Sequence, residues 1–130
     1  MLGSTEQTIA RGKPAEYQQE IVKLRYRRTI EKVSLANKVV ADFGCGNGAQ
    51  TYQFVKSSCK IIALDIDYDH LHTFSRLLGS QQIESVLLIQ CDGFRLPIAT
   101  GSIDIVLSYE VLEHVADESV ALHEIYRILK

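Results

Sequence analysis

The chain has 130 residues, of which 46% are hydrophobic and 23% are charged, and its formal net charge is −2. This length is typical of one domain that folds without a disulfide or metal, and the composition excludes a disordered chain. No apolar run approaches the roughly 20 residues of a membrane-spanning helix, and residues 1–14 lack the apolar segment of a secretory signal. The three cysteines form no CxxC pair, so we expect a cytoplasmic protein with reduced thiols and no metal site.

Basic and acidic residues are unevenly distributed along the chain. Residues 1–33 carry seven Lys or Arg against four Glu, whereas residues 34–130 carry seven Lys or Arg against twelve Asp or Glu. A solvated helix face is the favoured interpretation of the basic cluster, and contact with an anionic substrate or nucleic acid is the alternative. The cluster consists of Lys23, Arg25, Arg27 and Arg28.

The pattern of apolar residues predicts alternating helices and strands. Residues 1–14 are expected to form a polar arm, and helical spacing predicts a helix from Ala15 to about Ser34. Four apolar runs predict buried strands. They are the run from Val39 into Asp42-Phe43-Gly44, and the runs Lys60–Asp65, Ser85–Gln90 and Ile103–Ser108.

Three further helices are expected between and after these strands. The first spans about Ala49 to Ser57, and the second spans about Tyr68 to Leu78, with Leu71, Phe74 and Leu78 on its apolar face. The third begins at Asp117 as N-cap and has an apolar stripe of Leu122, Ile125, Tyr126 and Leu129. This alternation predicts an α/β fold whose parallel sheet is covered by helices on both faces.

Glycines and carboxylates follow the predicted strands, where ligands bind in such folds. The four places are Asp42–Gly48, Asp65–Asp67, Asp92–Gly93 and Ser108–Glu110. The glycine loop alone is ambiguous, because Gly44-x-Gly46-x-x-Ala49 also fits a dinucleotide fingerprint, with Asp65 at the place of its ribose-binding acid. However, Asp42 would repel a pyrophosphate and attract a ligand that bears an ammonium and a sulfonium, by about 4 kcal/mol for charges about 4 Å apart.

The other two acids offer acceptors to such a ligand. Asp65 has two oxygens for adjacent ribose hydroxyls, and Asp92 can accept from an adenine amino group while the backbone at Gly93 or Phe94 meets a ring nitrogen. An Asx turn at Asp92 is the alternative to ligand binding there. For Asp67 and Asp69 we favour capping of the following helix.

Four segments together resemble the class I, Rossmann-like S-adenosylmethionine-dependent methyltransferases, in particular the small-molecule (methyltransferase-11-like) branch that includes quinone-biosynthesis enzymes. The segments are VVADFGCGNG, IIALDID, QCDGFRLP and GSIDIVLSYEVLEHVAD, and the resemblance covers about residues 38–130. It implies a three-layer Rossmann-like fold, with an arm and lid helix in residues 1–34 and an incomplete S-adenosylmethionine-binding domain in residues 35–130.

The resemblance also implies roles for individual residues. The cofactor would meet Asp42, Gly44, Cys45 and Gly46 at its methionine end, Asp65 at its ribose, and Ile66, Asp92, Gly93 and Phe94 around its adenine. Ser108 would lie beside the amino-acid end of the cofactor, Glu110 and Tyr17 would face the substrate, and His114 is the candidate general base. Histidine suits that role because its pKa lies near neutral pH.

The function implied is in-line transfer of a methyl group from S-adenosylmethionine to a small-molecule acceptor, without membrane or nucleic-acid partners. The alternatives are a non-catalytic cofactor-binding module, an oxidoreductase with a nucleotide cofactor, and a nucleic-acid methyltransferase. The last is disfavoured because Ser108-Tyr109-Glu110 stands where such enzymes have a segment like Asn-Pro-Pro-Tyr.

The C-terminal strands of the usual seven-stranded fold are missing from this sequence. Members of the resembling family continue beyond the position of Lys130 through three more strands. Without them Ile103–Ser108 becomes an apolar edge strand, which is prone to pair with another chain. We therefore expect either a piece of a longer protein or a homodimer in which a second copy covers this edge.

Overall fold

The structure is a computed structural model that describes residues 15–109 and 111–130. Contacts between Cα atoms divide the chain into two compact units, Met1–Ser34 and Leu35–Lys130. The described element of the first unit is helix α2, Ala15–Lys32, which confirms the helix expected there. The arm of residues 1–14 and the side chain of Tyr17 lie outside what the structure describes.

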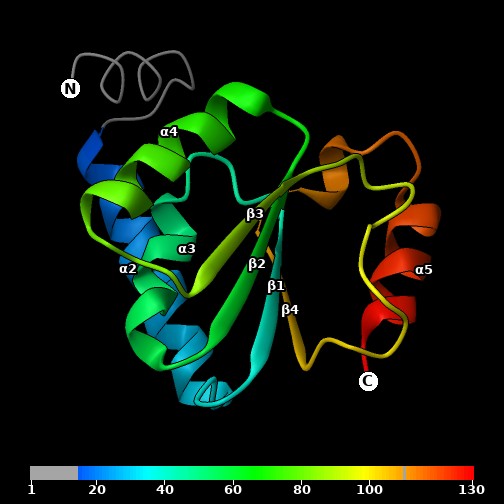
Figure 1. The fold of residues 1–130 in the computed structure, drawn as a ribbon, viewed down its shortest axis with the longest axis horizontal. Helices are drawn as coiled ribbons and strands as arrows, with labels where there is room; N and C mark the ends of the chain where they lie inside the picture. Colours follow the sequence, from blue (N-terminus) through cyan, green and yellow to red (C-terminus); the bar gives the residue numbers. More distant parts are fainter. Residues whose placement is uncertain (1–14, 110) are drawn as a thin grey trace. The chain divides into compact units, whose positions relative to one another are not determined.

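The second unit is built on a four-stranded parallel sheet with the order β3-β2-β1-β4 (Figure 1). This confirms the predicted parallel α/β architecture. The strand order reverses between β1 and β4, because β2 and β3 follow on one side of β1 and β4 lies on the other. The strands are β1 Val39–Phe43, β2 Lys60–Asp65, β3 Val86–Gln90 and β4 Ile105–Ser108.

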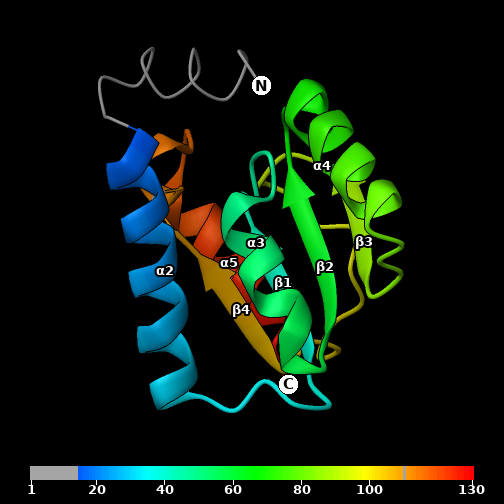
Figure 2. The same ribbon diagram turned by 90° about the vertical axis from the view of Figure 1, so that its left-hand side faces the viewer.

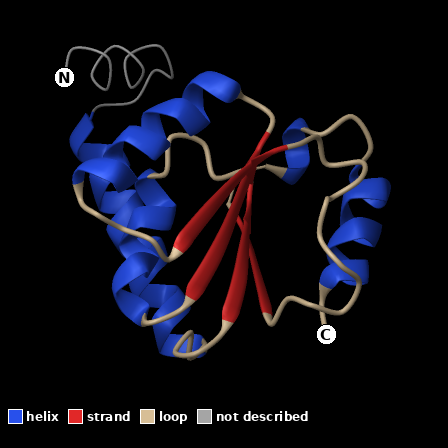
Figure 3. Ribbon diagram, in the orientation of Figure 1, coloured by secondary structure: helices blue, strands red, loops and turns tan. Residues whose placement is uncertain are grey.

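Helices cover both faces of this sheet, as expected for a three-layer fold. Figures 1 and 2 show α3 and α4 on one face and α5 on the other, and Figure 3 shows the strands lying between these helices. The helices of this unit are α3 Ala49–Phe54, α4 Tyr68–Ser80 and α5 Glu118–Ile128, with short 3-10 turns η1 Val55–Ser57 and η2 Leu112–His114.

Among the described residues, one apolar cluster packs between the sheet and α5 and another packs between the sheet and α4. Side chains alternate between the two faces of a strand, so neighbours along one strand belong to different clusters. The cluster on the α5 side contains Ala41, Phe43, Leu64, Leu96, Ile103, Ala121 and Ile128. The cluster on the α4 side contains Cys45, Ala63, Leu71, Phe74 and Leu78, which confirms the apolar face predicted for α4.

Aspartate side chains fix the beginnings of α4 and α5. Asp67 accepts hydrogen bonds from the backbone N–H groups of Asp69 and His70, and Asp117 accepts from those of Ser119 and Val120. Such caps satisfy N–H groups that the first helical turn leaves without partners. The expected N-cap at Asp117 and the capping role favoured for Asp67 are both confirmed.

Several predicted boundaries differ from the structure by one or two residues, and two larger differences have a visible cause. The helix expected from Ala49 to Ser57 is an α-helix only to Phe54 and then tightens into η1, which ends where Ser58 adopts a left-handed φ of 55°. The strand expected from Ile103 begins at Ile105, because Ile103 forms a separate parallel bridge with Leu129.

The apolar stripe predicted for the last helix is wrong in part. Leu122 and Tyr126 are 49% and 79% exposed, whereas Ala121 and Ile128 are buried. Ile125 is half-buried and packs on the α5-side cluster, so the inward face follows the spacing 121, 125, 128. The helix is turned by about one residue from the prediction, because Ala121 in place of Leu122 packs in the cluster between α5 and the sheet.

β4 stands at one end of the strand order, and within the described residues it pairs with β1 alone. Coverage of this edge by a second copy of the chain stays a prediction, for which the oligomeric state in solution is the test. Within residues 15–109 and 111–130, no helix combines the length and the apolar character needed to cross a membrane.

Candidate functional site

The segments that follow β1 and β2 are tied together at the carboxyl end of the sheet. The backbone N–H groups of Gly44 and Cys45 donate to the carbonyl oxygen of Leu64 at 2.8 and 2.9 Å. The N–H of Gly46 donates to Oδ2 of Asp65 at 2.8 Å. The predicted glycine loop and the predicted ribose-binding acid are therefore neighbours in space.

Three glycines of this loop adopt left-handed backbone conformations. They differ in which atoms a side chain at each position would meet. A Cβ at Gly44, where φ is +77°, would lie 2.2 Å from Cγ2 of Val111, and one at Gly48, where φ is +88°, would lie 2.2 Å from the Phe74 ring. Gly46 has a φ of +56° and no neighbouring atom within 4 Å of the position its Cβ would take. Open space beside Gly46 would let a ligand approach the backbone closely.

Asp65 joins the two segments and keeps acceptor capacity. Its Oδ2 accepts from Gly46 N–H, and its Oδ1 accepts from Asp67 N–H at 2.8 Å. An ionised carboxylate offers about four lone-pair sites, so about two remain for a ligand such as a ribose diol. The Asp65 side chain is half-buried, which leaves it accessible from the sheet edge.

Asp42 lies deeper than its neighbours, with 2% of its surface exposed. The hydroxyl of Thr51 donates a hydrogen bond of 2.5 Å to its Oδ2. The pKa of Asp42 is raised to about 6, because the effects of burial and of the Asp65 charge together exceed the lowering effect of the Thr51 hydrogen bond. The Asp42 carboxyl is thus protonated more readily than that of an exposed aspartate, and it lies two residues before the glycine loop begins.

The segment after β3 reaches the same edge. Oδ1 of Asp92 accepts from the backbone N–H of Phe94 at 3.0 Å, which is the Asx turn considered as the alternative for this residue. A Cβ at Gly93 would lie 2.9 Å from the Phe43 ring, so this turn sits against the end of β1. Two predicted adenine contacts are exposed apolar side chains, Ile66 at 68% and Phe94 at 48%.

The residues after β4 are only partly described. Ser108 is half-buried and pairs in register with Phe43. Val111, two residues after Tyr109, reaches Gly44 of the glycine loop. Glu110, a predicted substrate contact, lies outside the described residues, as does the side chain of Tyr17.

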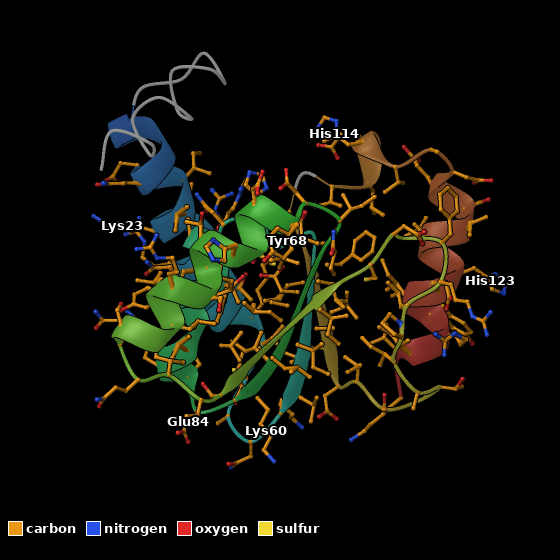
Figure 4. All side chains as sticks on the ribbon, turned by 45° about the horizontal axis from the view of Figure 1, so that its top comes forward. Lys23, Lys60, Tyr68, Glu84, His114 and His123 are labelled. Atoms are coloured by element: carbon orange, nitrogen blue, oxygen red, sulfur yellow. The ribbon has the colours of Figure 1, made fainter. Side chains whose placement is uncertain are left out.

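His114 is placed on the surface. Its side chain is 77% exposed on η2, and its Nε2 lies 3.9 Å from Oε1 of Glu113. Figure 4 shows the imidazole projecting outward from the ribbon at this turn. In this arrangement the His114 side chain points to solvent and does not join Asp42 and Asp65.

The cysteines are free thiols. Burial, and then the charges of Asp42 and Asp65, raise the pKa of Cys45 well above its usual range, and burial raises the pKa of Cys91 to about 11. Since the thiolate is the nucleophilic form, this shift disfavours nucleophilic chemistry at Cys45, which packs as a buried side chain in the α4-side cluster. Among the residues that the structure describes, no three His, Cys, Asp or Glu side chains are grouped as a metal site.

Sequence reasoning missed two residues of this region, Thr51 and Val111. Thr51 is the buried partner of Asp42, and Val111 packs where a side chain at Gly44 would lie. The signal for Thr51 was its polarity at an inward position of α3, next to a helical face that also buries Phe54. Val111 gave no signal, because its contact depends on how the segment after β4 folds back.

Comparison with known proteins agrees with this geometry. Residues 41–130 match the family model of the methyltransferase domain. Demethylmenaquinone methyltransferase of Lactococcus lactis is 30% identical over 107 residues, which are 79% of this chain and 42% of that protein. Ubiquinone biosynthesis O-methyltransferase of Pseudomonas putida is 29% identical over 115 residues, 85% of this chain and 48% of that protein.

The fold is likewise that of solved methyltransferase structures. A SAM-dependent methyltransferase from Aquifex aeolicus superimposes with a TM-score of 0.74 at 16% identity, over 81% of this chain and 58% of that one. Because the family model covers more than half of the sequence, the chain belongs to the methyltransferase domain family. It spans less than half the length of the two relatives named above.

Proposed function

We propose that this chain is the cofactor-binding part of an S-adenosylmethionine-dependent methyltransferase that acts on a small molecule. The observation that carries the proposal is the junction of Gly46 and Asp65, where a carboxylate with spare acceptors lies beside an open stretch of glycine backbone. The relatives named for quinone methylation support a small-molecule acceptor.

The residues present fit the cofactor in charge and in hydrogen bonding. Asp65 would hold the two ribose hydroxyls with its remaining lone pairs. Ile66 would pack on the adenine, whose edge would meet Asp92 and the backbone of Gly93 and Phe94. The methionine end would lie over Asp42, Gly44, Cys45 and Gly46, beside Ser108.

S-adenosylmethionine carries an activated methyl group on a sulfonium. The chain's own contribution is therefore to hold the cofactor and acceptor in line and to exclude water, effects worth up to roughly 7–11 kcal/mol when the geometry is good. These two effects require no nucleophile on the protein. The buried negative charge of Asp42 and the half-buried charge of Asp65 favour a cationic ligand over a pyrophosphate.

The test is calorimetric titration of the purified chain with S-adenosylmethionine, S-adenosylhomocysteine and NAD. We expect micromolar binding of the first two ligands and none of NAD. Asp65→Ala should abolish this binding, whereas the matched control Asp69→Ala, an exposed residue of the first turn of α4, should retain it. Binding of NAD alone would identify an oxidoreductase, and equal affinity in both variants would contradict the assignment of Asp65.

Two roles at the acceptor side belong to the same proposal. Tyr17 and Glu110 would contact the acceptor, and His114 would remove its proton. His114→Gln should then leave the affinity for S-adenosylhomocysteine unchanged and lower the rate of methyl transfer. A non-catalytic binding module would instead bind the cofactor and form no S-adenosylhomocysteine with any acceptor.

The basic cluster on α2 supplies the test for nucleic-acid methylation. Arg27 and Arg28 are exposed on α2. Replacing both by Gln should cause no salt-dependent loss of RNA or DNA binding if the acceptor is a small molecule. A large loss of such binding would favour a nucleic-acid substrate.

A further inference from the structure

We propose that Thr51 is a positioning residue of the cofactor site, whose hydroxyl orients the Asp42 carboxylate and stabilises it as an anion for the ammonium end of S-adenosylmethionine. This inference rests on the proposed function, because it assigns Thr51 to the same site. It concerns the methionine end of the ligand and leaves the ribose and adenine contacts to other residues.

The geometry of the pair is that of a buried hydrogen bond between a hydroxyl and a carboxylate. Thr51 is fully buried on α3, Asp42 is the penultimate residue of β1, and their oxygens are 2.5 Å apart. The two elements are joined directly by the glycine loop of residues 44–48. Hydrogen bonds to an ionised oxygen are shorter and roughly twice as strong as neutral ones, so this contact favours the carboxylate form.

The other groups around Asp42 act in the opposite direction. Burial and the charge of Asp65 on β2 both favour the neutral acid, and the Cys45 thiol in the loop is buried and uncharged. The Thr51 hydroxyl opposes both of them and thereby keeps the pKa of Asp42 near 6. Loss of this single donor would therefore move the carboxyl toward its neutral form within the physiological pH range.

Volume alone does not explain a threonine at this position. Valine has nearly the same shape and would fill the same space between β1 and α3 without donating a hydrogen bond. Serine would keep the hydroxyl and lose only a methyl group. Thr51→Val and Thr51→Ser therefore separate the electrostatic role from the packing role.

The first measurement needs no ligand. The carbon-13 NMR shift of the Asp42 carboxyl, followed from pH 4 to pH 9, reports its titration midpoint in each folded variant. Loss of a hydrogen bond to a charged group should raise the midpoint by about one pH unit or more in Thr51→Val. Thr51→Ser should return it close to the wild-type value, and thermal unfolding of each variant confirms that it folds.

The second measurement is the ratio of dissociation constants, Thr51→Val over wild type, for S-adenosylmethionine between pH 5.5 and pH 8.5. The ratio should be about tenfold at the acid end, where the variant is neutral, and should fall toward one at the alkaline end. For 5′-methylthioadenosine, which lacks the amino-acid end, the ratio should stay near one throughout. Thr51→Ser should resemble wild type with both ligands.

The outcomes separate this inference from the proposed function. An unchanged Asp42 midpoint, or a loss of affinity that is equal for both ligands and independent of pH, would show that Thr51 only packs and would overturn the inference. Failure of the wild-type chain to bind S-adenosylmethionine at any pH would overturn the proposed function and, with it, the assignment of Thr51 to a cofactor site.

Discussion

The left-handed glycines of the loop differ in how much space surrounds each residue. A methyl group at Gly48 would overlap the buried Phe74 ring, whereas a methyl group at Gly46 would meet nothing within 4 Å. Both positions carry the cost of a left-handed conformation in a residue with a Cβ, about 1–2 kcal/mol. Only Gly48 adds the cost of overpacking a filled core.

This contrast predicts that the same substitution affects mainly stability at Gly48 and mainly ligand binding at Gly46. Gly48→Ala should lower the free energy of unfolding by about 2–5 kcal/mol, measured by urea denaturation. Gly46→Ala should lower it by only about 1–2 kcal/mol but should weaken S-adenosylmethionine binding at least tenfold, since the added methyl group occupies the open space beside the loop. Normal binding by Gly46→Ala would contradict the placement of the ligand over this residue.

A second prediction at the scale of residues concerns Asp42, because its pKa in the folded protein, about 6, lies above its ordinary value of 3.8. A carboxyl with a raised pKa stabilises the fold fully below pH 3.8, and this contribution is lost as pH rises through 6. The difference corresponds to at most about 3 kcal/mol by pH 7. Asp42→Asn should therefore be more stable than wild type at pH 7, with a gain that disappears by about pH 4.

The control for Asp42→Asn is Asp69→Asn, which changes an exposed acid of the same type. Denaturant unfolding at several pH values gives the comparison directly. A variant at Asp42 that is less stable than wild type at pH 7, or whose gain does not depend on pH, would contradict the raised pKa. The same variant should bind S-adenosylmethionine poorly, since the site then lacks the anion.

At the scale of elements, Arg127 fastens the segment after β3 to α5. Its Nη1 and Nη2 atoms donate to the carbonyl oxygens of Ile98 and Leu96 at 2.9 Å each, Nη1 also donates to Oγ1 of Thr100 at 3.1 Å, and Nε pairs with Glu124. A guanidinium can make these bonds together because its donors form a rigid planar fork.

Arg127→Met should consequently lower the free energy of unfolding by about 2 kcal/mol. The substitution leaves without a partner two carbonyl oxygens that in the wild-type chain accept hydrogen bonds from a charged group. Arg95→Met, on the same segment but exposed, is the matched control and should change stability by less than about 0.5 kcal/mol. Urea denaturation measures both values. Equal losses in the two variants would show that the hydrogen bonds of Arg127 do not stabilise the contact between α5 and the segment after β3.

The helices and strands could be predicted from local sequence patterns. Which face of a helix is buried against the sheet could not. The apolar runs before Asp42 and Asp65 identified β1 and β2, and the caps at Asp67 and Asp117 fixed two helix starts. The buried face of α5 was predicted around large residues such as Tyr126, whereas tertiary packing selected the small Ala121 instead. Local hydrophobicity carries no information about how closely a helix approaches a sheet.

The candidate site shows the same division. The acids after the strands could be predicted because parallel strands end at one edge of the sheet. The depth of Asp42 and its pairing with Thr51 depend on where α3 packs, nine residues further along the chain. For Asp92 both readings of the sequence remained open, and the structure shows the Asx turn with Phe94.

At the scale of the whole molecule, every buried apolar side chain among the described residues belongs to the unit of residues 35–130. These side chains run from Leu35 to Ile128, and the α4-side and α5-side clusters both consist of residues of this unit. Its ends are also secured internally. Asp104 accepts a hydrogen bond of 2.8 Å from Val39 N–H, and its other oxygen lies 2.9 Å from Nζ of Lys130, which joins the first strand to the end of the chain.

A chain that begins at Leu35 is therefore expected to fold cooperatively by itself. It should show a single denaturant transition and bind S-adenosylhomocysteine with an affinity within a few-fold of the complete chain, because the predicted cofactor contacts all lie between Asp42 and Ser108. If α2 acts as a lid, its removal should mainly speed ligand release, which stopped-flow displacement measures. The absence of a cooperative transition in the shortened chain would show that the first unit is required for folding, and a large loss of affinity with folding intact would place part of the cofactor site before Leu35.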